Sequence, residues 1–129
     1  MLAIDTNLIV RYLTGDHPKQ SARARALIDG QAVFVAITVM LEAEWVLRSA
    51  YGRGPIDVAR ALRAFAGLPT VTVGDAIVVA NALDLAEKGM DFADALHLGK
   101  SAHCEGFVTF DRKFVKAARA GGYEHAQEA

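Results

Sequence analysis

The feature that most constrains the fold is an alternation of short apolar segments with longer helical patterns. Apolar, β-branched runs predict strands at residues 2–4, 32–36, 70–73 and 107–110, with 123–126 as a candidate edge strand. The segments between them predict a helix that carries Leu8 to Leu13 and ends at Gly15, and further helices at about 18–28, 38–50, 56–65, 75–88, 91–103 and 112–120. Strands joined through helices pair in parallel. We therefore predict an α/β fold, a three-layer α/β/α sandwich with helices on both faces of a short, mostly parallel sheet.

Length and composition indicate one folded domain over residues 1–129. A hydrophobic share of 53% with 22% charged residues is ample for a core. No run approaches the roughly 18 apolar residues of a membrane span, and Asp5 and Arg11 interrupt the N-terminal run, so we expect a cytoplasmic protein without a membrane segment. The single cysteine, Cys104, excludes an internal disulfide and is expected to be a small buried side chain.

The net charge of -1 argues against a broad basic face for nucleic acid. A site that binds divalent cations must, however, concentrate acidic residues, and these cancel lysines and arginines elsewhere in the chain. The charge therefore does not separate a nuclease from an enzyme that acts on small molecules.

Two aspartates follow predicted strands directly. Asp5 follows residues 2–4 and Asp111 follows residues 107–110, so both are expected in a crevice at the carboxyl edge of one sheet. Asp94 lies in the first turn of a predicted helix that begins at Asp91. Each of these acids also has a purely structural interpretation, because aspartate is favoured at helix N-termini.

Two glutamates lie in the middle of the helix predicted at residues 38–50. Glu42 shares a helical face with Val39, Trp45 and Val46, which predicts a desolvated carboxylate that needs a cation or a donor. Glu44 has Arg48 four residues on and is expected to form an ordinary exposed ion pair.

Carboxylates gathered in one cleft repel one another and raise each other's pKa values unless divalent cations neutralise them. Oxygen ligands alone select hard cations, so this sequence predicts Mg²⁺ or Mn²⁺, and the absence of a Cys/His cluster speaks against zinc. His97 and His103 are expected outside the direct ligand set. Arginines and lysines that could hold nucleic-acid phosphates are Arg11, Arg48, Arg53, Lys100, Arg112 and Lys113.

Four segments resemble VapC-type PIN domains in order and spacing across essentially the whole chain. They are residues 1–10 (MLAIDTNLIV), 41–47 (LEAEWVL), 91–96 (DFADAL) and 109–111 (TFD).

This resemblance implies a single PIN domain and a metal-dependent toxin endoribonuclease. Asp5, Glu42, Asp94 and Asp111 match the acidic quartet of the family, and Asn7 and Thr109 match its supporting polar positions. It also implies a homodimer inhibited by a VapB-type antitoxin. The alanine-rich helices and the apolar Leu8, Ile9, Tyr12 and Leu13 exceed the needs of one small core, so we expect some of them to form a dimer or antitoxin groove.

The implied mechanism is metal-assisted hydrolysis of an RNA phosphodiester. Asp5 and Asp94 are the best direct ligands, Asp111 a ligand or an anchor for water, and Glu42 a ligand or a base for the attacking water.

Three other classes fit the sequence less well. Asp5-Thr6-Asn7 lacks the second aspartate of haloacid-dehalogenase-like phosphatases. A receiver module would need an acidic pair at the first strand and a lysine after the last strand, and neither is evident. A Rossmann domain would need a glycine-rich loop after Ile4, and none follows it. A PIN-fold module that binds RNA or protein without cleaving it stays open as the alternative.

Overall fold

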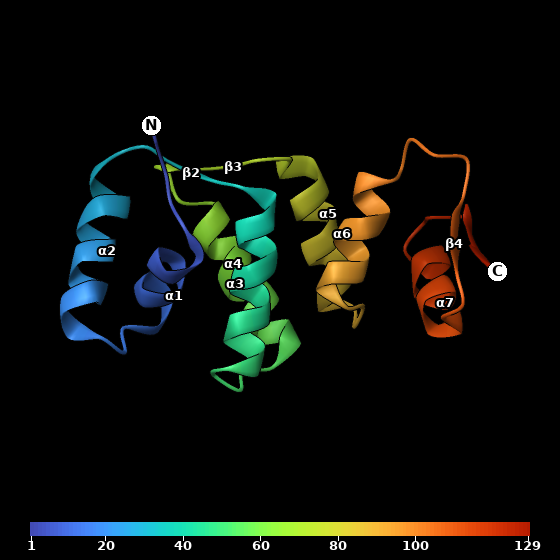
Figure 1. The fold of residues 1–129 in the computed structure, drawn as a ribbon, viewed down its shortest axis with the longest axis horizontal. Helices are drawn as coiled ribbons and strands as arrows, with labels where there is room; N and C mark the ends of the chain where they lie inside the picture. The colour runs from blue at the N-terminus through green and yellow to red at the C-terminus, as the bar shows by residue number, and fades with distance from the viewer.

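The computed structural model describes residues 1–129 and contains seven helices and five short strands. The strands are β1 (Leu2–Ala3), β2 (Val33–Val35), β3 (Val71–Val73), β4 (Phe107–Thr109) and β5 (Ala126–Glu128). The helices are α1 (Thr6–Thr14), α2 (Pro18–Gly30), α3 (Ile37–Ser49), α4 (Pro55–Ala66), α5 (Ala76–Glu87), α6 (Phe92–Lys100) and α7 (Arg112–Ala120). Figure 1 shows that the helices make up most of the molecule.

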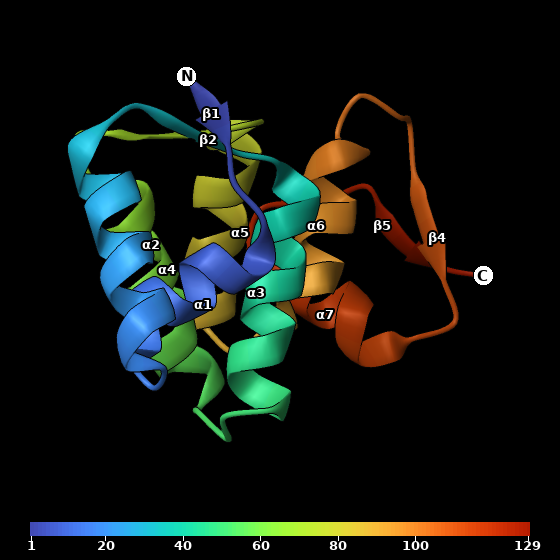
Figure 2. The same cartoon turned by 60° about the vertical axis from the view of Figure 1, so that its left-hand side comes forward.

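Every strand pair is parallel, which confirms the predicted α/β class with a short parallel sheet. The sheet comes in two parts: β1, β2 and β3 form one, in that order, and β4 pairs with β5 in the other. In Figure 2 the β4–β5 pair stands apart from β1 and β2. Because β1 and β4 are not paired, their carboxyl ends do not meet at one sheet edge.

Local sequence signals account for the helix boundaries. Asp5 caps α1 by accepting a hydrogen bond from the Leu8 amide, and Gly15 ends it in the left-handed conformation with a φ of 66°. Pro18 and Pro55 occupy the first positions of α2 and α4, where a missing N–H removes no helical hydrogen bond. Asp111 caps α7, which has the predicted bounds.

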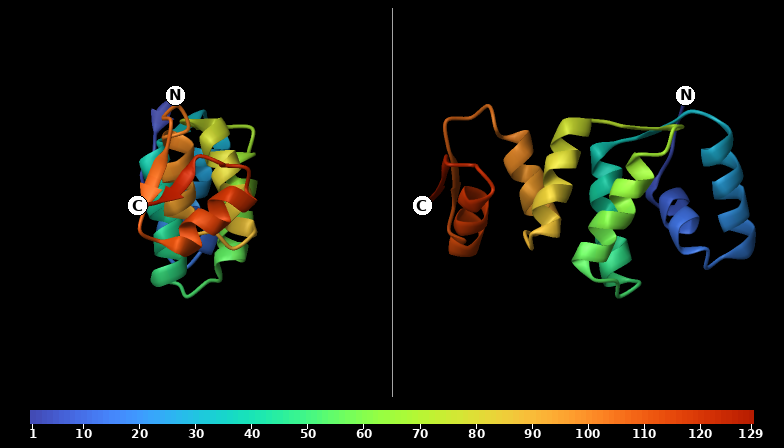
Figure 3. Two further views of the ribbon diagram at one scale, coloured as in Figure 1. Left: turned by 90° about the vertical axis from the view of Figure 1, so that its right-hand side faces the viewer. Right: turned by 180° about the vertical axis from the view of Figure 1, so that it is seen from behind.

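The core is a continuous cluster of aliphatic and aromatic side chains that includes Ile9, Val33, Leu47, Leu62 and Leu98. The helical pairs α1/α2, α4/α5 and α5/α6 pack against one another along the long axis of the molecule (Figure 3). No helix in the structure has the length and apolar character that crossing a membrane requires.

Several predicted details were wrong. The last strand is residues 126–128 rather than 123–126, because the chain turns at Glu124 and His125 before it pairs with β4. Helix α6 ends at Lys100 instead of about residue 103, and α2 runs to Gly30 instead of about residue 28. Cys104 is exposed, because it lies in the turn after α6 and not on a packed face.

Candidate active site

The carboxylate of Asp94 lies half-buried in the first turn of α6. Its backbone N–H donates to Oδ2 of Asp91 at 3.1 Å, but no hydrogen bond or ion pair satisfies its own side chain. The pKa of Asp94 is raised above its usual value by burial first, and further by the charges of Asp91 and Asp111, while His97 acts in the opposite direction. Asp94 is thus an acid that the protein itself leaves uncompensated.

Asp111 lies in the same pocket as Asp94. The pocket has a volume of about 290 Å³ and is lined by Gly89, Met90, Asp91, Asp94, Asp111, Lys113, Phe114 and Ala117. Oδ1 of Asp111 accepts the Lys113 and Phe114 amides at 2.9 and 3.1 Å, so it caps α7 and leaves Oδ2 for another partner. The Asp111 amide donates to Oγ1 of Thr109 at 3.0 Å, and this bond holds the aspartate at the end of β4.

Asp5 and Glu42 form a second group. Thr6, which is buried beside Asp5, donates a hydrogen bond from Oγ1 to Oε1 of Glu42. Asp5 itself accepts the Leu8 amide at 3.3 Å and lines a pocket of about 240 Å³ with Asn7, Leu8, Arg11, Gln20 and Arg23. The contact between Thr6 and Glu42 joins the start of α1 to the middle of α3.

The predicted environments of the two glutamates were wrong. Glu44 is 2% exposed, and its two oxygens accept from Nε and Nη2 of Arg48 at 2.6 and 3.1 Å, whereas Glu42 is exposed. The buried stripe of α3 consists of Met40, Ala43, Glu44 and Leu47, the i, i+3, i+4 and i+7 positions of one face. The prediction took Trp45 as a marker of the core, but Trp45 lies on the exposed side.

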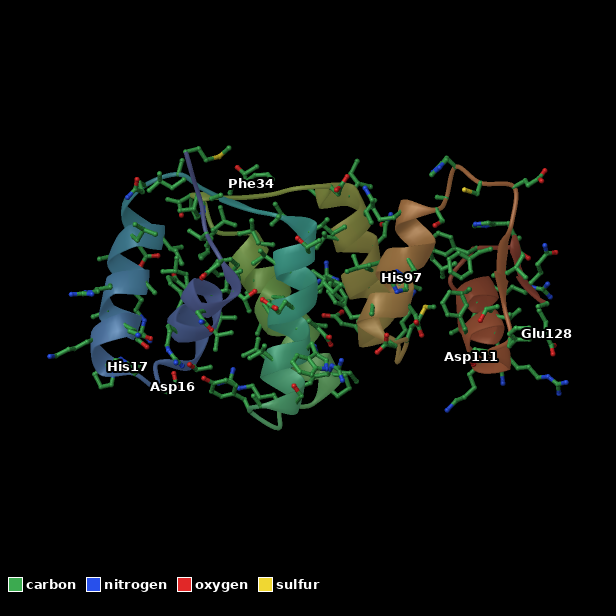
Figure 4. The ribbon with its side chains drawn as sticks, in the orientation of Figure 1. Asp16, His17, Phe34, His97, Asp111 and Glu128 are labelled. Carbon is green, nitrogen blue, oxygen red and sulfur yellow. The ribbon has the colours of Figure 1, made fainter.

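The structure does not bring the four predicted acids into one ring: Asp94 and Asp111 share a pocket, whereas Glu42 bonds to Thr6, the neighbour of Asp5. Helices α1 and α7, which Asp5 and Asp111 cap, lie on opposite sides of α3 to α6 along the long axis (Figure 1). Figure 4 places Asp111 at the start of α7, toward the opposite end of the molecule from Asp16 and His17. No three Asp, Glu, His or Cys side chains lie close enough together to enclose a cation.

Helix α3 lies between the two groups and has a contact with each. Glu42 bonds to Thr6 beside Asp5, and Nη2 of Arg48 lies 4.0 Å from Oδ1 of Asp91, which lines the pocket of Asp94. Asp91, which was predicted only as a helix cap, therefore belongs to the acidic pocket. Its spacing of three residues from Asp94 is the one feature of the sequence that indicates this.

The donor atoms of the Asp94 pocket are of the kind that hard divalent cations prefer. Mg²⁺ keeps several of its waters in proteins and binds through one or two carboxylates together with substrate phosphate, so it does not need an enclosing cage. Asp94 offers a carboxylate without a protein donor, and Asp111 offers its Oδ2. Both donors are oxygens, which suits Mg²⁺ or Mn²⁺.

Most of the basic residues considered for phosphate binding already have partners. Arg11 pairs with Asp16 at 3.1 Å, Lys100 with Asp75 at 3.4 Å and Arg112 with Glu128 at 3.0 Å. Hydrogen bonds from Tyr51 and Thr14, with the Arg11 charge, lower the pKa of Asp16 to about 2. Lys113 forms no ion pair and lines the Asp94 pocket. Arg23 lines the Asp5 pocket and was not among the basic residues predicted to bind phosphate.

The structure thus describes an α/β protein with parallel strands and an acidic pocket that contains Asp91, Asp94 and Asp111. The family model described as PIN domain matches residues 2–120, and the chain belongs to the PIN domain family. PIN domains have a nuclease-type fold, which agrees with hydrolysis of nucleic acid at an acidic pocket. Comparison with curated proteins and with solved structures gave no match.

Proposed function

We propose that this protein is a Mg²⁺- or Mn²⁺-dependent endoribonuclease, the toxin component of a VapBC-type toxin–antitoxin pair that acts in the cytoplasm. The observation that carries the proposal is Asp94, a half-buried carboxylate without a protein partner, whose pKa rises through burial and two neighbouring aspartates. An uncompensated acid of this kind destabilises the fold unless a cation binds it. Membership of the PIN domain family supports the choice of a nuclease over other cation-dependent proteins.

In this proposal Asp5, Glu42, Asp94 and Asp111 are the metal-binding and catalytic residues. A bound divalent cation supplies a water of lowered pKa and neutralises charge on the phosphodiester. Asp94 and Asp111 provide carboxylate oxygens in one pocket, and the α7 cap together with Thr109 fixes the direction of Asp111. Asp5 and Glu42 provide a second acidic pair beside Thr6, where Glu42 can accept a proton from an attacking water.

The proposed partners are RNA, a VapB-type antitoxin and a second copy of the chain. The apolar residues of α1 were expected to form a contact surface, but Ile9 is fully buried and Leu8, Tyr12 and Leu13 pack against the core. Other large apolar side chains are exposed, and these are available for contacts with an antitoxin or a second copy of the chain: Met1, Leu2, Ile56, Ile77, Val108 and Phe110.

The test is cleavage of defined structured RNAs by the pure protein with Mg²⁺, with Mn²⁺ and with excess EDTA. We expect cleavage with either cation, none with EDTA, and none from Asp94→Asn, whose circular dichroism should match the wild type because the amide keeps the shape of the side chain. Cleavage in EDTA, or near wild-type turnover by Asp94→Asn, would refute the metal-dependent mechanism.

The second candidate is a PIN-fold module that binds RNA or protein without cleaving it. One observation favours it: the four acids do not form one ring, and no three acidic side chains enclose a cation position. RNA binding by wild-type protein that cleaves no RNA under any of these conditions would identify this alternative.

A further inference from the structure

Trp45 is the only tryptophan of the chain, and 59% of it is exposed although it lies in the middle of α3. The opposite face of this helix is buried through Met40, Ala43 and Leu47, so the indole is not needed to fill the core. A large aromatic ring exposed on a rigid helix offers an apolar face to a binding partner at little cost in conformational entropy.

The indole borders the residues of the proposed site. It lines a pocket of about 390 Å³ with Thr38, Leu41, Glu42, Glu44, Arg48 and Ala93. Glu42 bonds to Thr6 beside Asp5, and Arg48 approaches Asp91, which lines the Asp94 pocket. Trp45 therefore lies on the helix that joins the two acidic groups.

The chemistry of this pocket favours a nucleobase over a protein surface. Only three of its seven lining residues are hydrophobic, and its charged residues are one cation, Arg48, and two acids, Glu42 and Glu44. The centres of protein–protein interfaces are depleted of charged residues, whereas sites for single-stranded nucleic acid combine an aromatic platform with nearby cations. Glu44 holds the Arg48 guanidinium in place through two hydrogen bonds, and Nη1 of Arg48 makes none within the protein.

We propose that Trp45 is a stacking platform for one base of the strand that the acidic site binds. This inference rests on the proposed function, because it places the base next to the acids that bind and cleave the strand. A base must leave a duplex before it can stack on a side chain, and a single strand offers its bases without that penalty.

The experiment uses the single tryptophan as its own reporter. Short single-stranded RNA, and the same sequence annealed as a duplex, are titrated into Asp94→Asn protein with Mg²⁺ while indole fluorescence is recorded, and affinities are measured in parallel with a labelled strand. Stacking predicts quenching that saturates with the single strand and is much weaker with duplex. Trp45→Ala should weaken single-strand binding about 5- to 100-fold, and Trp45→Phe should retain most of the affinity.

Ile77→Ala is the matched control, because Ile77 is 79% exposed on α5 and lines none of the pockets described here. It should bind like the parent protein. The dependence of affinity on salt should be the same with and without Trp45, since no charge is removed. Three results would overturn the inference in favour of another role, such as a protein contact. They are an unchanged affinity of Trp45→Ala for the single strand, equal quenching by duplex and single strand, and a fluorescence change that depends on protein concentration instead of RNA concentration.

The two proposals fail separately. Metal-dependent cleavage with an unchanged KM in Trp45→Ala overturns the stacking role and leaves the nuclease intact. Saturable quenching by single strands in a protein that cleaves no RNA supports the stacking role and refutes the nuclease.

Discussion

The ion pair between Glu44 and Arg48 is expected to stabilise the fold far more than a surface pair. The Glu44 side chain is 3% exposed and that of Arg48 is 31% exposed, and two hydrogen bonds join them at 2.6 and 3.1 Å. The hydrogen bond to Glu44 is the main cause that raises the pKa of Arg48, with burial acting against it. The i,i+4 spacing alone predicts an exposed contact, which contributes only about 0.3–0.5 kcal/mol.

Glu44→Gln keeps the shape of the side chain but removes the charge and at least one of the two charge-assisted bonds. Such bonds contribute about 1.5–3 kcal/mol in proteins. The loss stays below the roughly 3–5 kcal/mol of a fully buried broken pair, because Arg48 is partly exposed and can turn toward water or Asp91. With an unfolding entropy of about 2.1 cal/mol/K per residue, a chain of 129 residues loses about 4 °C per kcal/mol. We therefore expect Tm to fall by about 6–11 °C.

The assay is thermal unfolding followed by circular dichroism at neutral pH, with urea unfolding as a second measure. Glu42→Gln is the matched control, since the same change two positions away affects an exposed side chain and should shift Tm by no more than about 2 °C. Glu44→Leu combined with Arg48→Met should recover much of the loss, because an apolar pair leaves no charge unpaired. A Tm of Glu44→Gln within 2 °C of the wild type would refute the buried ion pair.

Four further results are expected. Because folding raises the pKa of Asp94, its charge destabilises the fold as pH rises above the usual aspartate range. In EDTA, the Tm of Asp94→Asn should therefore exceed that of the wild type at pH 7 and equal it at pH 3. Equal Tm values of the two proteins at both pH values would contradict the raised pKa. Added Mg²⁺ or Mn²⁺ should raise the Tm of the wild type but not of Asp94→Asn, and an equal rise in both would place the cation elsewhere. Glu42→Gln should reduce kcat/KM for RNA about 30-fold, which corresponds to about 2 kcal/mol of transition-state stabilisation. Glu44→Gln, assayed well below its Tm, should retain activity. The reverse result would assign the catalytic role to Glu44. Expression of the chain alone should arrest growth and co-expression of its antitoxin should restore it, whereas harmless expression of soluble protein would count against a toxin.

The sequence by itself determined the features that depend on neighbouring residues. The order of strands and helices follows from apolar periodicity and was predicted within a few residues, and α7 was predicted with its observed bounds. Asp5, Asp91 and Asp111 accept backbone amides at the starts of α1, α6 and α7, because an aspartate before a helix compensates unpaired N–H groups within its own first turn. The PIN domain resemblance was equally available, since it depends on motifs and their spacing, and the family match over residues 2–120 confirms it.

The tertiary structure alone decided which side chains share an environment. Periodicity shows that Glu42 and Glu44 point in different directions, but which of them is buried depends on where neighbouring helices cover α3, and they cover the face with Ala43 and Leu47. Sequence likewise could not show that Asp94 shares a pocket with Asp111 while Asp5 lies beside Thr6 and Glu42. That grouping depends on the position of the segment formed by β4, α7 and β5. Contacts between residues far apart in the chain, such as the packing of Phe114 in the core, set this position. No local sequence pattern contains these contacts.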